Sequence, residues 1–365
     1  MKILSKITKI ITLSFIIILL TGCNSNYQSL NNLGIVSSLL IDKIDDKYKA
    51  YIEIYKEEKN SNSTKSSSYF IEGTGNSIKD AINNASLKTS KTLYFVHINA
   101  VIFSKNSINN SLNDIFNYLE KRIQLNSNYY ILISDNVKEL TKLKMKDNPI
   151  LGEKVKNIIE YTSNNGVTIK YDYLDKLYNF VSPNKDVFIN KVSKNKDGII
   201  ISNAYYFDDN KLKGELNNNE LKLVNLYKNN KNIYFNLKYN NEYYVIKIDS
   251  SNIKYDINND INIKINIKAS IDSASSNLNL LKTETIKKLN KDASIELTKK
   301  MNKLIKKLKK DHSDILGITD YIKKTKRKSN LNFYNDETNF NIKVSISKKG
   351  LIQNTIGGKI DEKWY

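Results

Sequence analysis

Cysteine and histidine are the side chains here best suited to nucleophilic catalysis or metal binding, and both are rare. The chain of 365 residues has one cysteine, Cys23, and two histidines, His97 and His312. A serine or cysteine nucleophile needs a histidine base that a carboxylate orients, and a zinc site needs three or four clustered ligands. No such spacing occurs in the sequence. We therefore expect no catalytic residue, no metal site, no cofactor and no enzymatic activity, which argues against a secreted hydrolase.

Each histidine has a structural explanation. His97 falls within the apolar run 92–103, which predicts a buried strand in which the ring would hydrogen-bond inside the fold. His312 follows a long helical segment, where a cationic ring suits the negative end of the helix dipole. The turn Gly73-Thr74-Gly75-Asn76-Ser77 lacks the third glycine of a dinucleotide fingerprint and the Gly-Lys-Ser/Thr of a P-loop. It is typical of a capped helix start.

Cys23 differs because it follows a short leader. Lysines precede the apolar run Ile10 to Leu20, and Thr21 and Gly22 stand directly before the cysteine. This pattern predicts a secretory signal peptide over residues 1–22, with an apolar run about half of the ~20 residues that span a bilayer. Leu20, Thr21, Gly22 and Cys23 resemble the bacterial lipobox, in which the cysteine sulfur is lipidated. The alternative is an ordinary signal peptide with a chance cysteine, but a lone thiol in a secreted chain has no disulfide partner.

The bulk composition limits the possible partners. Without its leader the chain keeps 343 residues, enough for two or three domains without disulfides. The net charge of +20 suits nucleic acid, anionic lipid or an acidic partner, and export argues against nucleic acid. The segment Lys282–Lys328 holds 16 basic and 6 acidic residues. It is either a solvated helix face or a surface that meets lipid or an acidic partner subunit.

The first half of the mature chain alternates strands and helices. Residues 23–32 are polar and predict a tether between lipid and fold. Residues 33–195 form the expected N-terminal region, which could divide into two domains. Strands are predicted at 35–41, 48–55, 69–73, 92–103 and 129–133, helices at 78–85, 112–123, 137–143, 150–161 and 171–180, and a polar loop at 61–68. This succession indicates a mixed sheet with helices.

Residues 196–365 form the expected C-terminal domain. Strands at 199–201, 205–207, 233–237, 243–248, 261–267 and 342–346 mostly alternate, which favours a largely antiparallel sheet with one wet face. One long helix is predicted over Thr283–Lys310, with an apolar stripe at gaps of three and four residues. The stripe consists of Ile286, Leu289, Ala293, Leu297, Met301, Leu304 and Leu308. We therefore predict a multi-domain α+β (mixed α/β) ectodomain, whose second sheet packs on one long helix.

Four segments, in order, carry a family resemblance. They are Leu30–Val36 with the strand ending at Asp42, Glu72–Ala81 running on to His97, Ala204–Leu216, and Ser313–Ile318 after the long helix. Together they are similar to the C subunit of bacterial spore germinant receptors, the GerAC-type lipoproteins of the Ger(x)C family. Two positions depart from the family pattern: Asn24-Ser25 replaces Trp-Asp, and Lys323–Lys328 replaces a stretch with Pro and Trp.

The resemblance implies a function in nutrient-triggered spore germination. It implies a three-domain α/β-type ectodomain without catalytic activity, assembled with two integral-membrane subunits on the outer face of the spore inner membrane. The expected anchor is Cys23, carrying palmitate and contacting membrane lipid. The alternative is a solute-binding lipoprotein of a transporter. That class would show two similar lobes around a ligand cleft, whereas the two halves of this chain differ in pattern.

Overall fold

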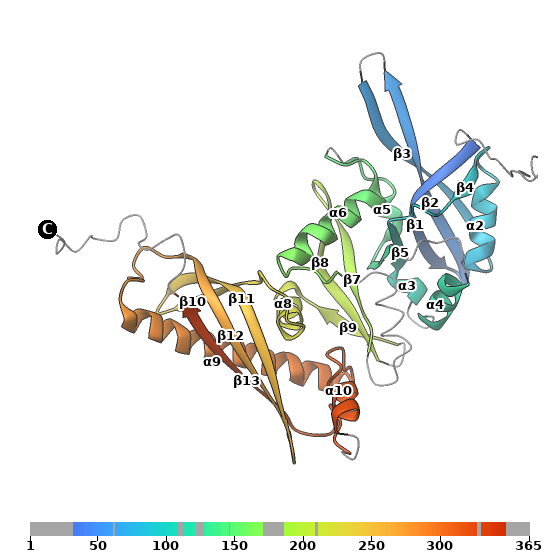
Figure 1. The fold of residues 1–365 in the computed structure, drawn as a ribbon. Helices are drawn as coiled ribbons and strands as arrows, with labels where there is room; N and C mark the ends of the chain where they lie inside the picture. The colour runs from blue at the N-terminus through green and yellow to red at the C-terminus, as the bar shows by residue number, and fades with distance from the viewer. Residues whose placement is uncertain are drawn as a thin grey trace, which may run out of the picture.

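The computed structural model describes residues 32–60, 63–108, 112–121, 128–145, 147–170, 186–208, 211–326 and 330–347. They form two β-sheets with helices packed against them, an α+β architecture as predicted (Figure 1). Cys23 and its lipobox, Leu20, Thr21 and Gly22, lie outside the described residues, as do the tether up to residue 31 and the helix expected at 171–180.

The first sheet has nine strands in the order β3-β2-β1-β5-β6-β7-β8-β9, with β4 paired to β1 beside this path. Their bounds are β1 (Leu33–Ile44), β2 (Lys47–Asn60), β3 (Ser63–Gly75), β4 (Thr92–Tyr94), β5 (Ala100–Ser104), β6 (Tyr130–Ser134), β7 (Phe188–Asn195), β8 (Gly198–Asp208) and β9 (Lys211–Leu216). The centre is parallel and both sides end in antiparallel hairpins. The expected mixed sheet is therefore confirmed.

Helices cover both faces of this sheet. One face packs on α2 (Ile78–Ser86), α3 (Lys105–Ile108) and α4 (Leu112–Glu120), and the other on α5 (Val137–Leu140) and α6 (Leu151–Asn164). Every residue of β5 and β6 is buried. This explains why their sequences are apolar without alternation, since a strand covered on both faces has no wet side.

The hairpin between β1 and β2 follows from a two-residue turn. Ile44 pairs with Lys47, and the two residues between them, Asp45 and Asp46, have φ values of 48° and 59°. Two left-handed residues make the turn whose twist matches antiparallel strands, and Asp tolerates this conformation. The hairpin predicted from alternation is confirmed.

The second sheet has the order β10-β11-β12-β13. Its strands are β10 (Tyr234–Tyr239), β11 (Glu242–Ile257), β12 (Ile261–Ala274) and β13 (Thr338–Ser347). The first two pairings are antiparallel, whereas β13 runs parallel to β12 because α9 (Thr283–Lys310) carries the chain back along the sheet. The predicted stripe of α9 is buried against the sheet, as expected. Two further helices, α8 (Asn218–Tyr227) and α10 (Ile318–Thr325), contribute buried residues to the same core.

Three predictions of detail are wrong. Residues 199–201 and 205–207 form β8 of the first sheet, because a tight turn before Gly198 (φ 137°) folds β8 onto β7, which is paired with β6. The first sheet thus continues through residues 195 and 196, and the division of the chain there stays a prediction. Residues 63–68, expected in a loop, belong to β3, which pairs with β2 in a ribbon that projects beyond the sheet (Figure 1). The run 92–103 is two strands rather than one.

Candidate functional surfaces

His97 lies in an exposed turn, so its prediction as a buried strand residue is wrong. β1 pairs with β4 through Leu33 to Ile35 and with β5 only from Ser38 onward. The chain turns in the gap between the two partners, and the Ile98 N–H donates to the Phe95 carbonyl at 3.1 Å. The imidazole instead packs edge-on against Tyr94, with ring centroids 5.8 Å apart.

His312 follows α9 at its C-terminal end, as predicted. It is exposed and left-handed (φ 52°), its N–H donates to Lys309 O at 3.1 Å, and Ser313 N–H donates to Leu308 O at 2.9 Å. These two bonds are the C-terminal cap known as the Schellman motif. His97 lies between β4 and β5 of the first sheet, whereas His312 follows α9, which packs on the second sheet. Among the described residues, no group of three or more His, Cys, Asp or Glu side chains is placed to hold a metal ion.

The glycine-rich turn is a helix start, as expected. A Cβ on Gly73 would lie 2.2 Å from Ala81 O and Ala85 N, so α2 packs directly on the backbone of β3. Ser77 caps α2 by accepting the Asp80 N–H at 3.1 Å. Close packing of helix on strand therefore accounts for the glycine, without a phosphate ligand.

The segment Ser313–Ile318 joins the two sheets. The Asp314 carboxylate is buried and accepts the N–H groups of Ile318 at 3.0 Å and Thr319 at 2.7 Å, which caps α10. Ser313 Oγ donates to the Phe207 carbonyl of β8 at 2.6 Å. One of the four segments that carry the family resemblance is thus the connection between α9, α10 and the first sheet.

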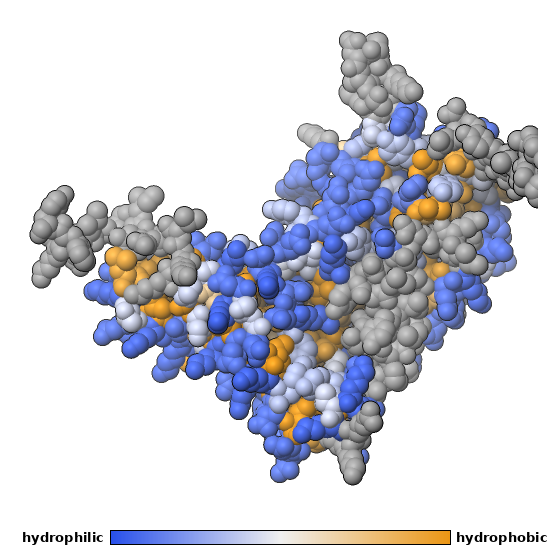
Figure 2. All heavy atoms as spheres, in the orientation of Figure 1, coloured by the Kyte–Doolittle hydropathy of each residue, from blue (hydrophilic) through white to orange (hydrophobic). Residues whose placement is uncertain are grey.

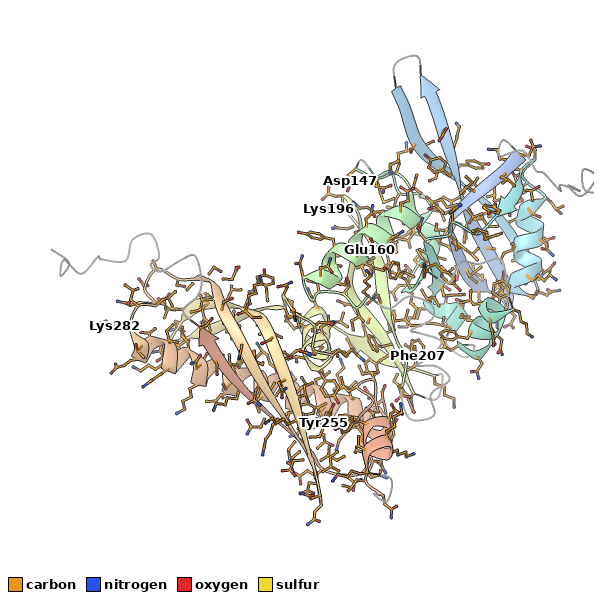
Figure 3. The ribbon with its side chains drawn as sticks, viewed as in Figure 1. Asp147, Glu160, Lys196, Phe207, Tyr255 and Lys282 are labelled. Carbon is orange, nitrogen blue, oxygen red and sulfur yellow. The ribbon has the colours of Figure 1, made fainter. Side chains whose placement is uncertain are left out.

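Asp186 completes this junction from the other side. Its carboxylate accepts the Asp314 N–H at 2.5 Å and the Tyr334 hydroxyl at 3.1 Å. Burial raises the pKa of Asp186 to about 6, and burial also raises the pKa of Asp314. Nearby, Tyr255 of β11 stacks on Tyr321 of α10 with centroids 3.7 Å apart. Figure 3 shows Tyr255 near α10 and Lys282 at the far end of α9.

The basic segment Lys282–Lys328 contains a polar ladder on α9 that serves the sheet. A row of side chains four residues apart hydrogen-bonds to the outer edge of β13. The pairs are Asn290 with Ile346, Ser294 with Val344, Thr298 with Ile342, and Asn302 with Phe340. Four helical residues rise ~6 Å and two strand residues ~6.6 Å, so the two repeats match. The ladder covers an edge that could otherwise pair with another chain.

A lysine row occupies the outer face of α9. It consists of Lys288, Lys291, Lys299, Lys303, Lys306 and Lys310, all exposed, and includes the exposed side chain of Ile295. None of these lysines forms an ion pair with another residue that the structure describes, whereas Lys307 pairs with Glu220 at 2.9 Å and Lys300 with Glu296 at 3.3 Å. Within the described part of the chain, the row is therefore a cationic surface whose charges are not paired.

A polar hollow of about 630 Å³ lies between the ends of α6 and α8. Asn164 from the end of α6 lines it, together with Lys170, Lys228 and Lys231. Both helices point their C-terminal ends toward this region, and lysines are favourable there because the helix dipole is negative. The helix dipoles are sufficient to explain why lysines line the hollow, without a bound ligand.

Comparison with known proteins identifies the class as spore germination proteins. Residues 26–194 match the family model described as spore germination protein N-terminal domain, and residues 202–354 match spore germination B3/GerAC like, C-terminal. The chain belongs to this GerAC family, the C subunits of germinant receptors, and the family supports a role in spore germination.

The fold agrees with a solved structure titled "Crystal Structure of the GerBC protein". The similarity has a TM-score of 0.52 at 15% identity and covers 84% of this chain and 96% of that chain, so it supports the fold alone. No curated protein matches the sequence. None of the helices in the described ranges is long and apolar enough to cross a membrane.

Proposed function

We propose that the chain is the lipid-anchored, non-enzymatic C subunit of a nutrient germinant receptor, acting through contacts with integral-membrane subunits. The observation that carries this proposal is the match of both halves to the GerAC family. The lipobox ending at Cys23 supports an anchor in the spore inner membrane, with the ectodomain on its outer face.

The junction supports a role as a rigid connector between subunits. Asp186, Ser313 and Asp314 link the two sheets through one partly buried and one buried hydrogen bond, and these bonds restrict the movement of one sheet relative to the other. A subunit that positions membrane partners needs such rigidity, because preorganised surfaces bind with less loss of conformational entropy.

Affinity purification from spore membranes tests this function. A tagged full-length chain should co-purify with two integral-membrane subunits, identified by mass spectrometry, and an untagged strain is the control. Deletion of the gene should abolish the response to nutrients. Recovery of a transporter permease in place of receptor subunits would instead support the solute-binding lipoprotein.

A further inference from the structure

The point where the tether enters the fold determines which surface lies near lipid. This inference rests on the proposed anchor at Cys23. Ten residues lead from Cys23 to Leu33, a reach of at most ~35 Å and an average of ~17 Å for a flexible chain. Leu33 pairs with Thr92, the first residue of β4. The surface around β4 is therefore held close to the membrane.

That surface is apolar and cationic. Leu87, at the end of α2, is 83% exposed, more than any other large apolar side chain among the described residues. Leu93, Tyr94, Phe95 and Val96 follow and are half-buried. Figure 2 shows apolar surface at this end of the molecule.

The same stretch carries positive charge and no negative charge. Lys88 is exposed, Lys91 is half-buried beside Gly34, and residues 87–97 contain no Asp or Glu. Aromatic side chains with apolar bodies and lysines with charged tips both suit the membrane interface, where each lysine near an anionic surface contributes about 1 kcal/mol. The apolar side chains and the lysines of this stretch therefore both favour a position at the membrane interface.

We propose that the β4 patch, residues Leu87–Val96, rests on anionic lipid headgroups, with Leu87 entering the apolar boundary. The lysine row of α9 lies on the second sheet, away from β4 in Figure 1, so the tether does not hold it at the bilayer. The patch orients the ectodomain and leaves the second sheet free for partner subunits.

Site-specific fluorescence tests the proposal. In the lipidated chain the Cys23 sulfur is a thioether, so Leu87→Cys introduces the one thiol that an environment-sensitive dye can label. Ile295→Cys in the lysine row, also an exposed apolar position, is the matched control. Each labelled protein is reconstituted on phosphatidylglycerol–phosphatidylethanolamine vesicles that contain a headgroup quencher, and flotation reports attachment.

The dye at position 87 should shift to the blue and be quenched, whereas the dye at position 295 should remain as in water. Floating protein with no change at position 87, or with equal changes at both positions, would overturn the patch while leaving the anchor intact. Protein that does not float would refute the anchor instead.

An unlipidated chain tests the patch independently of the anchor. Mature Cys23→Ser labelled at position 87 should still respond to added vesicles, and its partition should weaken roughly thirtyfold with Lys88→Gln and Lys91→Gln together, at about 1 kcal/mol for each lysine. Without the label, Leu87→Ser should weaken flotation of this chain roughly tenfold. Tyr161→Ser, an exposed aromatic on α6, should leave partition unchanged. No response at position 87 in either protein would refute the patch.

Discussion

The carboxylate of Glu53 on β2 accepts the backbone N–H of Gly152, near the start of α6, at 2.9 Å. It also accepts the N–H of Leu151 at 2.6 Å and the hydroxyls of Ser38 and Ser68 at 2.7 Å each. Each oxygen thus has two donors, and the side chain is fully buried. Burial raises the pKa of Glu53, and the four donated hydrogen bonds limit the rise. A strand carboxylate therefore fixes three strands to the positive end of a helix.

Glu53→Gln should destabilise the first sheet. The amide of glutamine cannot accept the two donors that one carboxylate oxygen accepts, so two buried donors lose their partner. We expect the free energy of unfolding to fall by about 1–3 kcal/mol, measured by urea denaturation. Glu57→Gln, exposed on the same strand, is the control and should stay within about 0.5 kcal/mol. Equal midpoints for the two variants would contradict this account.

Asp186 should make stability depend on pH. Its folded pKa of about 6 exceeds the ordinary value of 3.8, so the folded chain binds the proton more tightly than the unfolded chain. The free energy of unfolding should therefore fall as pH rises from about 4 to 6. Asp186→Asn retains an oxygen that can accept the Asp314 N–H and removes the buried charge. It should flatten this dependence and stabilise the protein by about 1–3 kcal/mol at pH 7.5.

Denaturation at pH 4.5 and 7.5 measures this effect. Asp272→Asn, an exposed carboxylate on β12, is the control and should leave the pH dependence as it is in the parent chain. A slope between pH 4 and 6 as steep in Asp186→Asn as in the parent chain would assign the effect to another buried carboxyl whose pKa is raised, such as Asp314.

The apolar stripe and the lysine row of α9 should respond differently to charge. Leu297 and Leu304 are buried against the second sheet, and loss of one such side chain costs ~2–5 kcal/mol. Leu297→Asp or Leu304→Asp should therefore abolish folding and deplete the protein from spores, measured by immunoblot. Lys299→Glu with Lys306→Glu should leave folding nearly intact, because an exposed charge contributes ~1 kcal/mol or less.

Germination of the double Glu variant then separates the two interpretations of the basic segment. A solvated surface predicts normal germination, which we expect. A folded variant that fails to germinate, with an association that also weakens as salt rises, would show that the row binds an acidic partner or anionic lipid.

Removal of the polar ladder should open the edge of β13. Thr298→Val keeps the shape of the side chain but leaves the Ile342 N–H without its partner, at about 1–2 kcal/mol. Together with Asn302→Leu it should expose enough edge for chains to associate, which sedimentation velocity detects. Thr285→Val, in the first turn of α9, is the control. A double variant that stays monomeric would show that something else protects this edge.

Cys23→Ala should move most of the protein out of the membrane fraction, because the β4 patch alone binds lipid weakly and reversibly, or should leave its leader uncut. Multiple acyl chains hold a protein on a bilayer, whereas one chain alone is marginal. Fractionation of spores with immunoblotting measures the result, and Asn24→Ala is the control. A variant that remains membrane-bound and functional would mean that another contact holds it.

The periodicity of apolar residues was sufficient to predict the long helix, whose formation depends on local sequence. The bounds Thr283–Lys310 of the long helix agree with the structure, since a stripe of 28 residues leaves little freedom. Membership of strands 199–207 in the first sheet was missed because no strand was predicted at Phe188–Asn195, the partner with which they form a hairpin. α8 was missed, although the capping box of Asn217 and Glu220 was a usable signal.

Glu53 and the polar ladder show a second limit. Glu53 stands in an alternating strand, where a carboxylate indicates a wet face. Its burial is favourable because donors from β1, β3 and the distant start of α6 converge on it. The ladder residues recur every four positions from Asn290 to Asn302, a visible pattern. Its meaning needs the register of β13, which the sequence of the helix does not contain.

The parallel pairing of β12 with β13 determines when the second sheet can be completed during synthesis on the ribosome. β12 ends at Ala274, but its neighbour begins only at Thr338, after α9 and α10 have been made. Until β13 is synthesised, the edge of β12 therefore remains unpaired, and the polar ladder of α9 has no strand to which it can hydrogen-bond. The sheet and the ladder are both completed only by β13, near the end of the described residues. A chain truncated before residue 338 would therefore expose the edge of β12, which could pair with another chain.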